Sequence, residues 1–131
     1  MKKQINSDEV GKFGENITVK YLKKQGYKIL EKNYRIHRLE MDIIAASKTH
    51  IVFVEVKTRR TDMNNLMRPS AAVDSDKLEN LISFVKAYTK RLPVKHSSKQ
   101  LRIDVCEVLV HQNGNRLSVD DINYIENAVM R

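Results

Sequence analysis

Residues 40–58 read EMDIIAASKTHIVFVEVKT, and this stretch is the most informative part of the chain. Two largely apolar segments rich in β-branched residues, 40–46 and 51–58, flank a polar run of four residues. Such segments are typical of strands, and the short polar connection between them predicts an antiparallel hairpin. Closing the hairpin through the polar run places Ala46 opposite Ile51.

The same hairpin gathers four charged side chains on one face. Side chains alternate between the two faces of a strand, so Glu55 and Lys57 point the same way. The predicted register places Asp42 opposite Glu55. It also places Glu40 opposite Lys57, where Glu40 is either an ion-pair partner of that lysine or a group supporting its neighbours. A buried charge is costly unless it is paired or bound to a metal, so this cluster needs an explanation.

Two interpretations of the cluster are open. In the first, Asp42 and Glu55 offer carboxylate oxygens to Mg²⁺ or Mn²⁺, hard cations that prefer such ligands. Lys57 would then orient or help deprotonate an attacking water and stabilise charge on a phosphate, which describes a phosphodiester hydrolase. In the second, the three side chains form a cross-strand ion network that only tolerates burial. The residues alone do not separate the two.

A helix is predicted before the hairpin. Its N-terminal cap is expected at Ser7 or Asp8, and Gly26 marks its end. Gly11 and Gly14 lie inside it. Because a glycine costs about 1 kcal/mol in a helix interior, these two indicate either a frayed first turn or the close approach of another element to that helix face.

The whole chain of 131 residues has the length of one domain, spanning residues 1–131. A strand at 27–35 completes a three-stranded antiparallel meander with the hairpin. The further predicted elements are a helix capped by Asp74 or Ser75 and closed before Pro93, a strand at 101–110, a turn at Asn113-Gly114, and short final strands or irregular edge segments at 116–119 and 122–125. This order predicts an α/β domain with one mixed central sheet flanked by helices.

The charge of the chain is positive and unevenly distributed. The formal net charge is +8, and residues 1–60 hold 14 Lys and Arg against 7 Asp and Glu. A lysine-rich solvated surface is one explanation. The asymmetry favours a face that binds a polyanion such as nucleic acid.

Composition also bears on the compartment. The chain has one cysteine, Cys106, which is expected to be a core side chain and excludes an internal disulfide or a cysteine-based zinc site. No apolar run approaches the length of a spanning helix, and the N-terminus lacks a signal peptide pattern. We therefore expect a cytoplasmic protein without a membrane segment.

Ordered motifs along the chain resemble the YraN family, which is grouped with the restriction-endonuclease-like nucleases, near the archaeal Holliday junction resolvases. The resemblance covers roughly residues 10–108. It rests on Gly11-x-x-Gly14-Glu15, Tyr21-Leu22-x-x-x-Gly26-Tyr27, Asn33-Tyr34-Arg35, Glu40-Met41-Asp42-Ile43-Ile44, Val52-Phe53-Val54-Glu55-Val56-Lys57-x-Arg59, Pro69-x-x-Ala72-Val73, Lys77 and Arg102-Ile103-Asp104-Val105.

The resemblance implies a restriction-endonuclease-like core with a PD-(D/E)xK nuclease site. Asp42 and Glu55 would be metal ligands for Mg²⁺ or Mn²⁺, Lys57 the catalytic lysine, and Glu15 on the first helix a further acid at the metal site. The expected activity is that of a metal-dependent DNA endonuclease acting on branched or structured DNA. A homodimer is expected by analogy with resolvase-like nucleases, which commonly pair two active sites.

The predicted contacts to nucleic acid are basic side chains near the hairpin. Arg35, Arg38, Arg59 and Arg60 would steer the phosphate backbone. Lys77 opens the second helix and is either solvated or in reach of a phosphate. Two other classes of function stay open, namely a nucleic-acid-binding module without turnover and a scaffold whose basic face docks an acidic partner.

Overall fold

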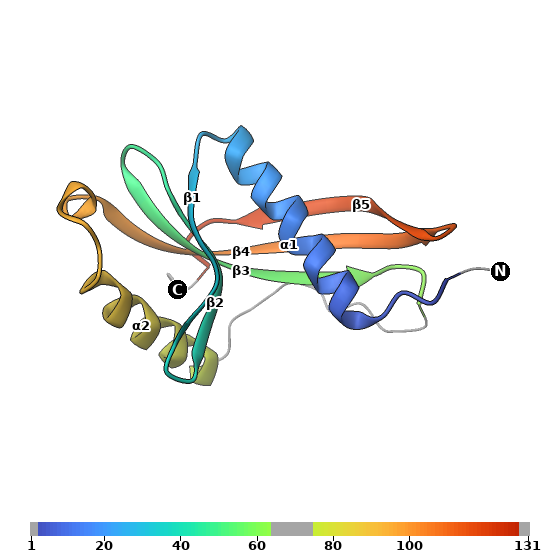
Figure 1. Cartoon of the computed structure of the whole chain (residues 1–131), viewed down its shortest axis with the longest axis horizontal. Helices are drawn as coiled ribbons and strands as arrows, with labels where there is room; N and C mark the ends of the chain where they lie inside the picture. The colour runs from blue at the N-terminus through green and yellow to red at the C-terminus, as the bar shows by residue number, and fades with distance from the viewer. Residues whose placement is uncertain (1–2, 64–74, 129–131) are drawn as a thin grey trace.

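The computed structural model describes residues 3–63 and 75–128, with residues 75 and 76 placed by their backbone alone. In chain order the elements are α1 (Ser7–Lys24), β1 (Lys28–Ile36), β2 (Leu39–Ala46), β3 (His50–Arg60), α2 (Ser75–Thr89), the 3-10 helix η1 (Val94–His96), β4 (Gln100–Asn113) and β5 (Arg116–Ile125) (Figure 1). None of the described helices is long and apolar enough to cross a membrane. Outside the described residues lie the predicted cap Asp74 and the motif residues Pro69, Ala72 and Val73.

The strands form one mixed sheet in the order β1-β2-β3-β4-β5. The first three strands are antiparallel neighbours, which confirms the predicted meander, and Ala46 lies opposite Ile51 as expected. β4 runs parallel to β3 and pairs with it along the whole of β3, and β5 returns antiparallel to β4. Parallel neighbours need a long crossover, and α2 lies in the segment that provides it.

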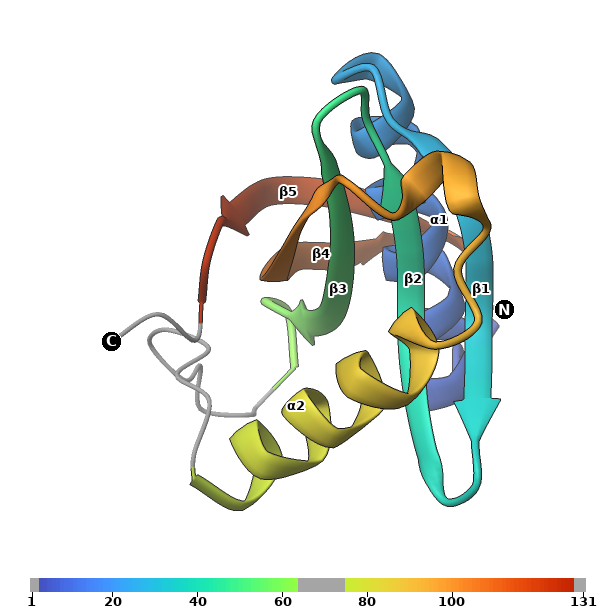
Figure 2. The ribbon, with the colours of Figure 1, turned by 90° about the vertical axis from the view of Figure 1, so that its left-hand side faces the viewer.

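The two helices cover opposite faces of this sheet (Figure 2). α1 packs on the face that carries Val52 and Val54 of β3, and α2 packs on the face that carries Ile51 and Phe53. All four of these side chains are fully buried. Because β3 has no solvent-facing side along this run, a charged residue that follows it needs a partner.

The N-terminus of α1 differs from the prediction, because its cap is Asn6 rather than Ser7 or Asp8. The Asn6 side chain accepts a hydrogen bond of 2.9 Å from the backbone N–H of Glu9. The Glu9 carboxylate in turn accepts one of 3.2 Å from the backbone N–H of Asn6. This reciprocal pair satisfies two backbone donors at once, which a single Ser or Asp cap does not do. The predicted end at Gly26 is confirmed by its φ of 93°.

The C-terminal region forms one strand rather than two short segments. β5 follows the predicted turn after Asn113, in which Gly114 has a φ of 66°. A register shift between Leu109 and Val110 of β4 marks a β-bulge. Because the bulge absorbs an extra residue, pairing resumes beyond it and residues 116–125 stay in a single strand.

The helix glycines have different surroundings. Gly14 is buried where α1 meets β3, and a Cβ at this position would overlap the Thr58 side chain. This confirms the close approach predicted for the helix face. At Gly11 a Cβ would meet no atom within 4 Å. Close packing therefore explains Gly14 and leaves Gly11 unexplained.

Alanine substitutions at these two glycines should have opposite effects on stability. Replacing Gly by Ala favours a helix by about 1 kcal/mol, so Gly11→Ala should raise the free energy of unfolding by about this amount. At Gly14 the added methyl group presses on Thr58, and overpacking of this kind costs about 1–3 kcal/mol. Urea denaturation of both variants measures the difference, and equal stabilities would contradict the contact with Thr58.

Candidate functional site

β2 and β3 separate at the charged end of their hairpin. Their pairing runs as predicted up to Ile43 opposite Val54. Beyond this pair, the backbone N–H of Val56 donates a hydrogen bond of 2.8 Å to Oδ2 of Asp42. The Asp42 carboxylate thus reaches β3 through its side chain, where the prediction had placed it in the ladder opposite Glu55.

Glu40 does not lie opposite Lys57, so this part of the predicted register is wrong. It lies opposite Arg35 of β1, and its Oε1 forms an ion pair of 3.2 Å with Nη2 of that arginine. The physical reason is that β2 stays paired with β1 up to the turn of their own hairpin, after its pairing with β3 has ended.

Carboxylates from three elements converge on Asp42. Its pKa is raised to about 7, chiefly because the group is buried. The hydrogen bond from Val56 lowers this pKa, and the negative charges of Glu55, Glu15 and Glu40 raise it further. The predicted metal acids from α1, β2 and β3 are therefore close enough for their charges to interact.

Glu55 ends the apolar run of β3 and is itself buried, with 8% of its surface exposed. Its Oε2 forms an ion pair with Nζ of Lys77, in the first turn of α2. Since a buried charge is costly unless paired, this lysine supplies the positive charge that Glu55 needs. The sequence had left Lys77 as a solvated side chain or a phosphate contact and did not identify this pair.

Lys57 follows Glu55 by two residues, so both side chains lie on the α2 face of β3. It is half-buried and lies beside Glu107 in the parallel register of β3 and β4. The Glu107 carboxylate accepts a hydrogen bond of 3.1 Å from Asn123. Within the described part of the chain, Lys57 forms no ion pair.

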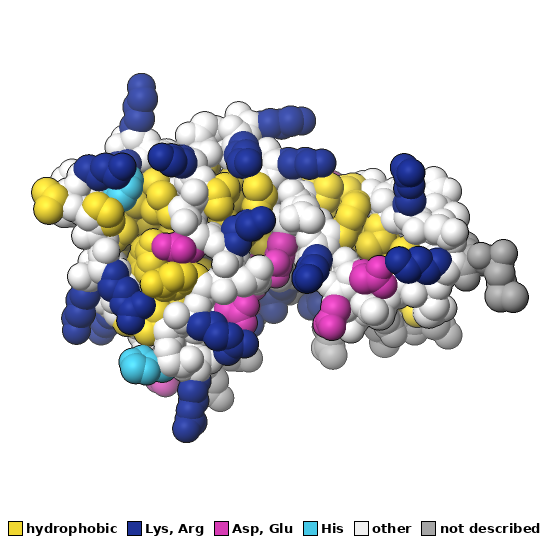
Figure 3. All heavy atoms as spheres, viewed as in Figure 1, with side chains coloured by type: hydrophobic (Ala, Val, Ile, Leu, Met, Phe, Trp, Pro, Cys, Tyr) yellow, Lys and Arg dark blue, Asp and Glu magenta, His cyan; other side chains and the backbone are white. Residues whose placement is uncertain are grey.

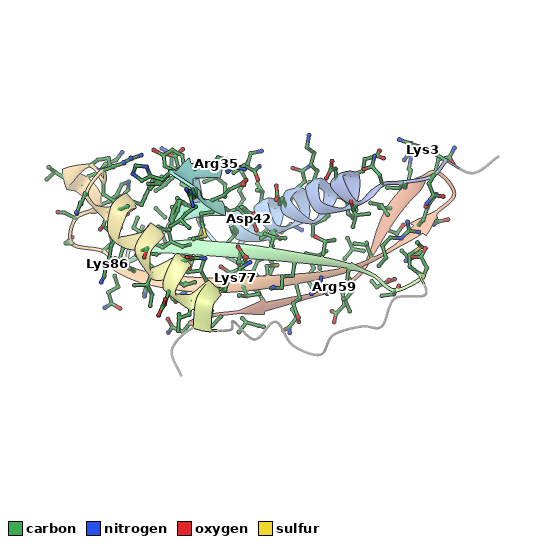
Figure 4. All side chains as sticks on the ribbon, turned by 90° about the horizontal axis from the view of Figure 1, so that it is seen from below. Lys3, Arg35, Asp42, Arg59, Lys77 and Lys86 are labelled. Atoms are coloured by element: carbon green, nitrogen blue, oxygen red, sulfur yellow. The ribbon has the colours of Figure 1, made fainter. Side chains whose placement is uncertain are left out.

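Two hollows flank these carboxylates. The α1 hollow, of about 380 Å³, contains Asp42 and Glu15 in its wall. The α2 hollow, of about 410 Å³, contains Glu55 and Lys77. Asp42 and Lys77 accordingly lie on opposite sides of β3 (Figure 4). The prediction that Asp42 shares a face with Glu55 is therefore wrong, because Met41 and Ile44 both pack on the α2 face and interrupt the alternation of β2 at Asp42. On the surface, acidic side chains gather around a notch at the lower edge of the molecule, with Lys and Arg side chains spread around them (Figure 3).

The residues that could hold a metal are a pair of carboxylates rather than a full cage. Among residues 3–63 and 75–128, no three His, Cys, Asp or Glu side chains are grouped so that they could bind one ion. Mg²⁺ commonly keeps several waters and binds through only one or two carboxylates. Asp42 and Glu55 therefore match the number of protein ligands that such an ion uses.

The four arginines predicted to contact nucleic acid fall into two groups. Arg59 lines the α1 hollow and Arg38 the α2 hollow. Arg35 and Arg60 have carboxylate partners, and Arg60 donates two hydrogen bonds of 2.9 Å to Asp62. This bidentate pairing raises the pKa of Arg60 and holds the pKa of Asp62 well below its usual range. Sequence reasoning missed this pair, although its spacing of two residues was a usable signal.

The fold places this chain among the mixed α/β proteins, with a five-stranded sheet and a helix on each face. Comparison with protein families then identifies the family. The model of the uncharacterised protein family UPF0102 matches residues 14–108. The chain belongs to the UPF0102 family, the YraN-type family that its motifs resemble.

Curated relatives match between 83% and 96% of the chain. A UPF0102 protein of Caldanaerobacter subterraneus is 41% identical over 126 residues, which cover 96% of this chain and 98% of the relative. One of Caldicellulosiruptor saccharolyticus is 40% identical over 124 residues, covering 95% and 99%. One of Syntrophus aciditrophicus is 43% identical over 111 residues, covering 83% of each chain. Their names state the family and no activity.

The raised pKa of Asp42 predicts a pH-dependent stability of the metal-free protein. Its pKa of about 7 exceeds the usual value of 3.8, so the folded state retains a proton that the unfolded state releases. Stability should therefore fall as the pH rises between these two values. Asp42→Asn keeps an oxygen acceptor for Val56 and removes the charge, so this fall should disappear in the variant.

Urea denaturation in EDTA at about pH 4.5 and about pH 8 measures the effect. Between these pH values, wild type should lose about 2–4 kcal/mol more than Asp42→Asn. Asp121→Asn, at an exposed aspartate of β5, is the matched control and should behave like wild type. An equal loss in wild type and Asp42→Asn would contradict the buried position of Asp42.

Proposed function

We propose that this chain is a metal-dependent DNA endonuclease with a restriction-endonuclease-like core. The proposal rests on the proximity of Asp42 and Glu55, two carboxylates close enough for the charge of one to raise the pKa of the other. Lys57 follows two residues after Glu55, in the order of the PD-(D/E)xK motif. The excess of basic residues in the first 60 positions favours a polyanionic substrate.

The donor set fits a hard divalent cation such as Mg²⁺ or Mn²⁺. Asp42 and Glu55 would hold it through carboxylate oxygens, and Glu15 adds a third acid on the Asp42 side. The buried negative charge around Asp42 favours a cation over a neutral ligand. When bound, such a cation polarises the phosphodiester and lowers the pKa of a bound water.

The remaining residues handle the water and the DNA backbone. The Lys57 ammonium group would orient the attacking water and stabilise the negative charge that develops on the phosphate. Water adds to phosphorus and releases a proton to solvent, the phosphorus–oxygen bond of the leaving strand breaks, and the departing oxygen takes up a proton from solvent. Arg38 and Arg59 bind flanking phosphates, and Arg35 and Arg60 do so by exchanging their carboxylate partners.

Branched or otherwise structured DNA is the proposed substrate, by the resemblance to resolvase-like nucleases. A homodimer is the proposed assembly, since two copies present two active sites to the two strands of such a substrate. The cytoplasm, where bacterial DNA is found, is the proposed compartment.

A nucleic-acid-binding module without turnover is the second candidate. It is favoured by the ion pair between Glu55 and Lys77, which already neutralises one of the two metal ligands. In this alternative the basic surface binds DNA and no cation replaces Lys77. The two candidates therefore differ in whether a divalent ion binds at Glu55.

Asp42→Asn and Lys57→Ala should each lower Mg²⁺-dependent cleavage of a four-way DNA junction by at least about 100-fold, the size of effect seen when one charge-stabilising group is removed. Binding of the junction should change by less than about threefold, because most phosphate contacts remain. Gel-based cleavage and fluorescence anisotropy measure the two quantities.

Asp121→Asn and Lys86→Ala, both at exposed positions, serve as matched controls and should cleave like wild type. Cleavage at the wild-type rate by both site variants would overturn the assignment. Binding without cleavage by wild type across Mg²⁺, Mn²⁺ and several DNA structures would favour the second candidate.

Lys77→Ala should strengthen the binding of Mn²⁺. If the cation displaces Lys77 from Glu55, removing the lysine removes a competitor. The affinity for Mn²⁺ should then rise about three- to tenfold, which corresponds to the free energy of a partly exposed ion pair. Isothermal titration calorimetry measures the affinity, with Lys86→Ala on the same helix as the control. Unchanged or weaker Mn²⁺ binding would show that Glu55 is not a ligand.

A further inference from the structure

The wall of the α1 hollow combines acidic and apolar side chains. Its carboxylates are those of Asp42, one of the two proposed metal ligands, and Glu15. The rest of the wall is largely apolar and comes from the segment before α1, from α1 itself, from β3 and from the residues after β3. Its apolar side chains are Ile5, Val10, Val56 and Met63.

Gly11 lies in the wall of this hollow and has no packing role that accounts for it. A Cβ there would meet no atom within 4 Å, in contrast to Gly14, and the residue lies beyond the first turn of α1. A helix-interior glycine costs about 1 kcal/mol relative to alanine. The glycine at this position keeps the hollow open, because any larger residue would narrow it.

The charges at the hollow fit the backbone of a nucleic acid. Arg59 and Arg60 both line it, and Arg60 is held by Asp62. A ligand that matches this wall has an apolar body for the aliphatic side chains and a phosphate for the arginines. A nucleotide within a polymer has both groups.

We propose that the α1 hollow binds the base of an unpaired nucleotide of the DNA, beside the scissile phosphate at Asp42. Its volume of about 380 Å³ lies within the range of about 300–1,000 Å³ for ligand pockets. A paired base would first have to leave the duplex, at a cost of a few kcal/mol, so bulges, branch points and single-stranded ends are favoured. The choice of DNA rests on the proposed function, whereas base binding needs no turnover.

The test uses the full chain in EDTA and two duplexes that contain 2-aminopurine. In one duplex this fluorescent base is unpaired in a single-nucleotide bulge, and in the other it is paired with thymine. Moving the base from the stack into an aliphatic pocket should raise its fluorescence at least about twofold. Gly11→Leu should remove this rise and weaken binding of the bulged duplex about tenfold, while binding of the paired duplex changes less than about twofold.

Asn16→Leu is the matched control, since it adds the same side chain at an exposed position of α1 away from the hollow. Circular dichroism verifies that both variants fold. Wild-type-like fluorescence and affinity in Gly11→Leu would overturn the proposal. The proposal would also be overturned if Gly11→Leu abolished the binding of adenosine monophosphate but left the binding of the bulged duplex unchanged. The hollow would then bind free nucleotides alone. Because no cleavage is measured, an inactive protein would still give a clear result.

Discussion

β3 lies between two helices and two strands, and along its first half neither face of it reaches water. Ile51 to Val54 are fully buried, and the next residue, Glu55, is a carboxylate in nearly the same environment. A charge in that position is stable only with a counter-charge, which Lys77 supplies from α2. Because β3 is buried on both faces, Glu55 needs Lys77 of α2 as its partner. Any cation that binds Glu55 must therefore compete with this lysine.

The geometry of the site depends on where β2 leaves β3. Pairing ends at Ile43 opposite Val54, and from there the Asp42 side chain accepts a hydrogen bond from Val56. Asp42 lines the α1 hollow together with Glu15, and Glu55 lines the α2 hollow, yet the charges of Asp42 and Glu55 are close enough to interact. The two hollows have no lining residue in common, and each carries its own acidic side chains.

Much of this was predictable from residue patterns. The period of two along residues 51–58 correctly put Glu55 on the face of Phe53, and the polar run after Ala46 correctly indicated the first pair of the hairpin. The prediction was wrong at Glu40 because it continued the pairing of β2 with β3 beyond Ile43, where β2 pairs with β1 alone. At the start of α1, the prediction of Ser7 or Asp8 as the cap was wrong because Asn6 forms reciprocal hydrogen bonds with Glu9. The family was recognisable from ordered motifs, and the family comparison bears this out.

Most of the elements, the mixed α/β class and the family followed from the residues alone, because local periodicity and motif order are properties of neighbouring residues. Two ion pairs became evident only in the three-dimensional structure, namely those of Lys77 with Glu55 and of Arg35 with Glu40. The same holds for the different surroundings of the two helix glycines, since Gly11 lines an open hollow and Gly14 packs against Thr58. These outcomes join residues that are distant in the chain or belong to different strands. They depend on where strands stop pairing and how helices dock, which local patterns do not encode.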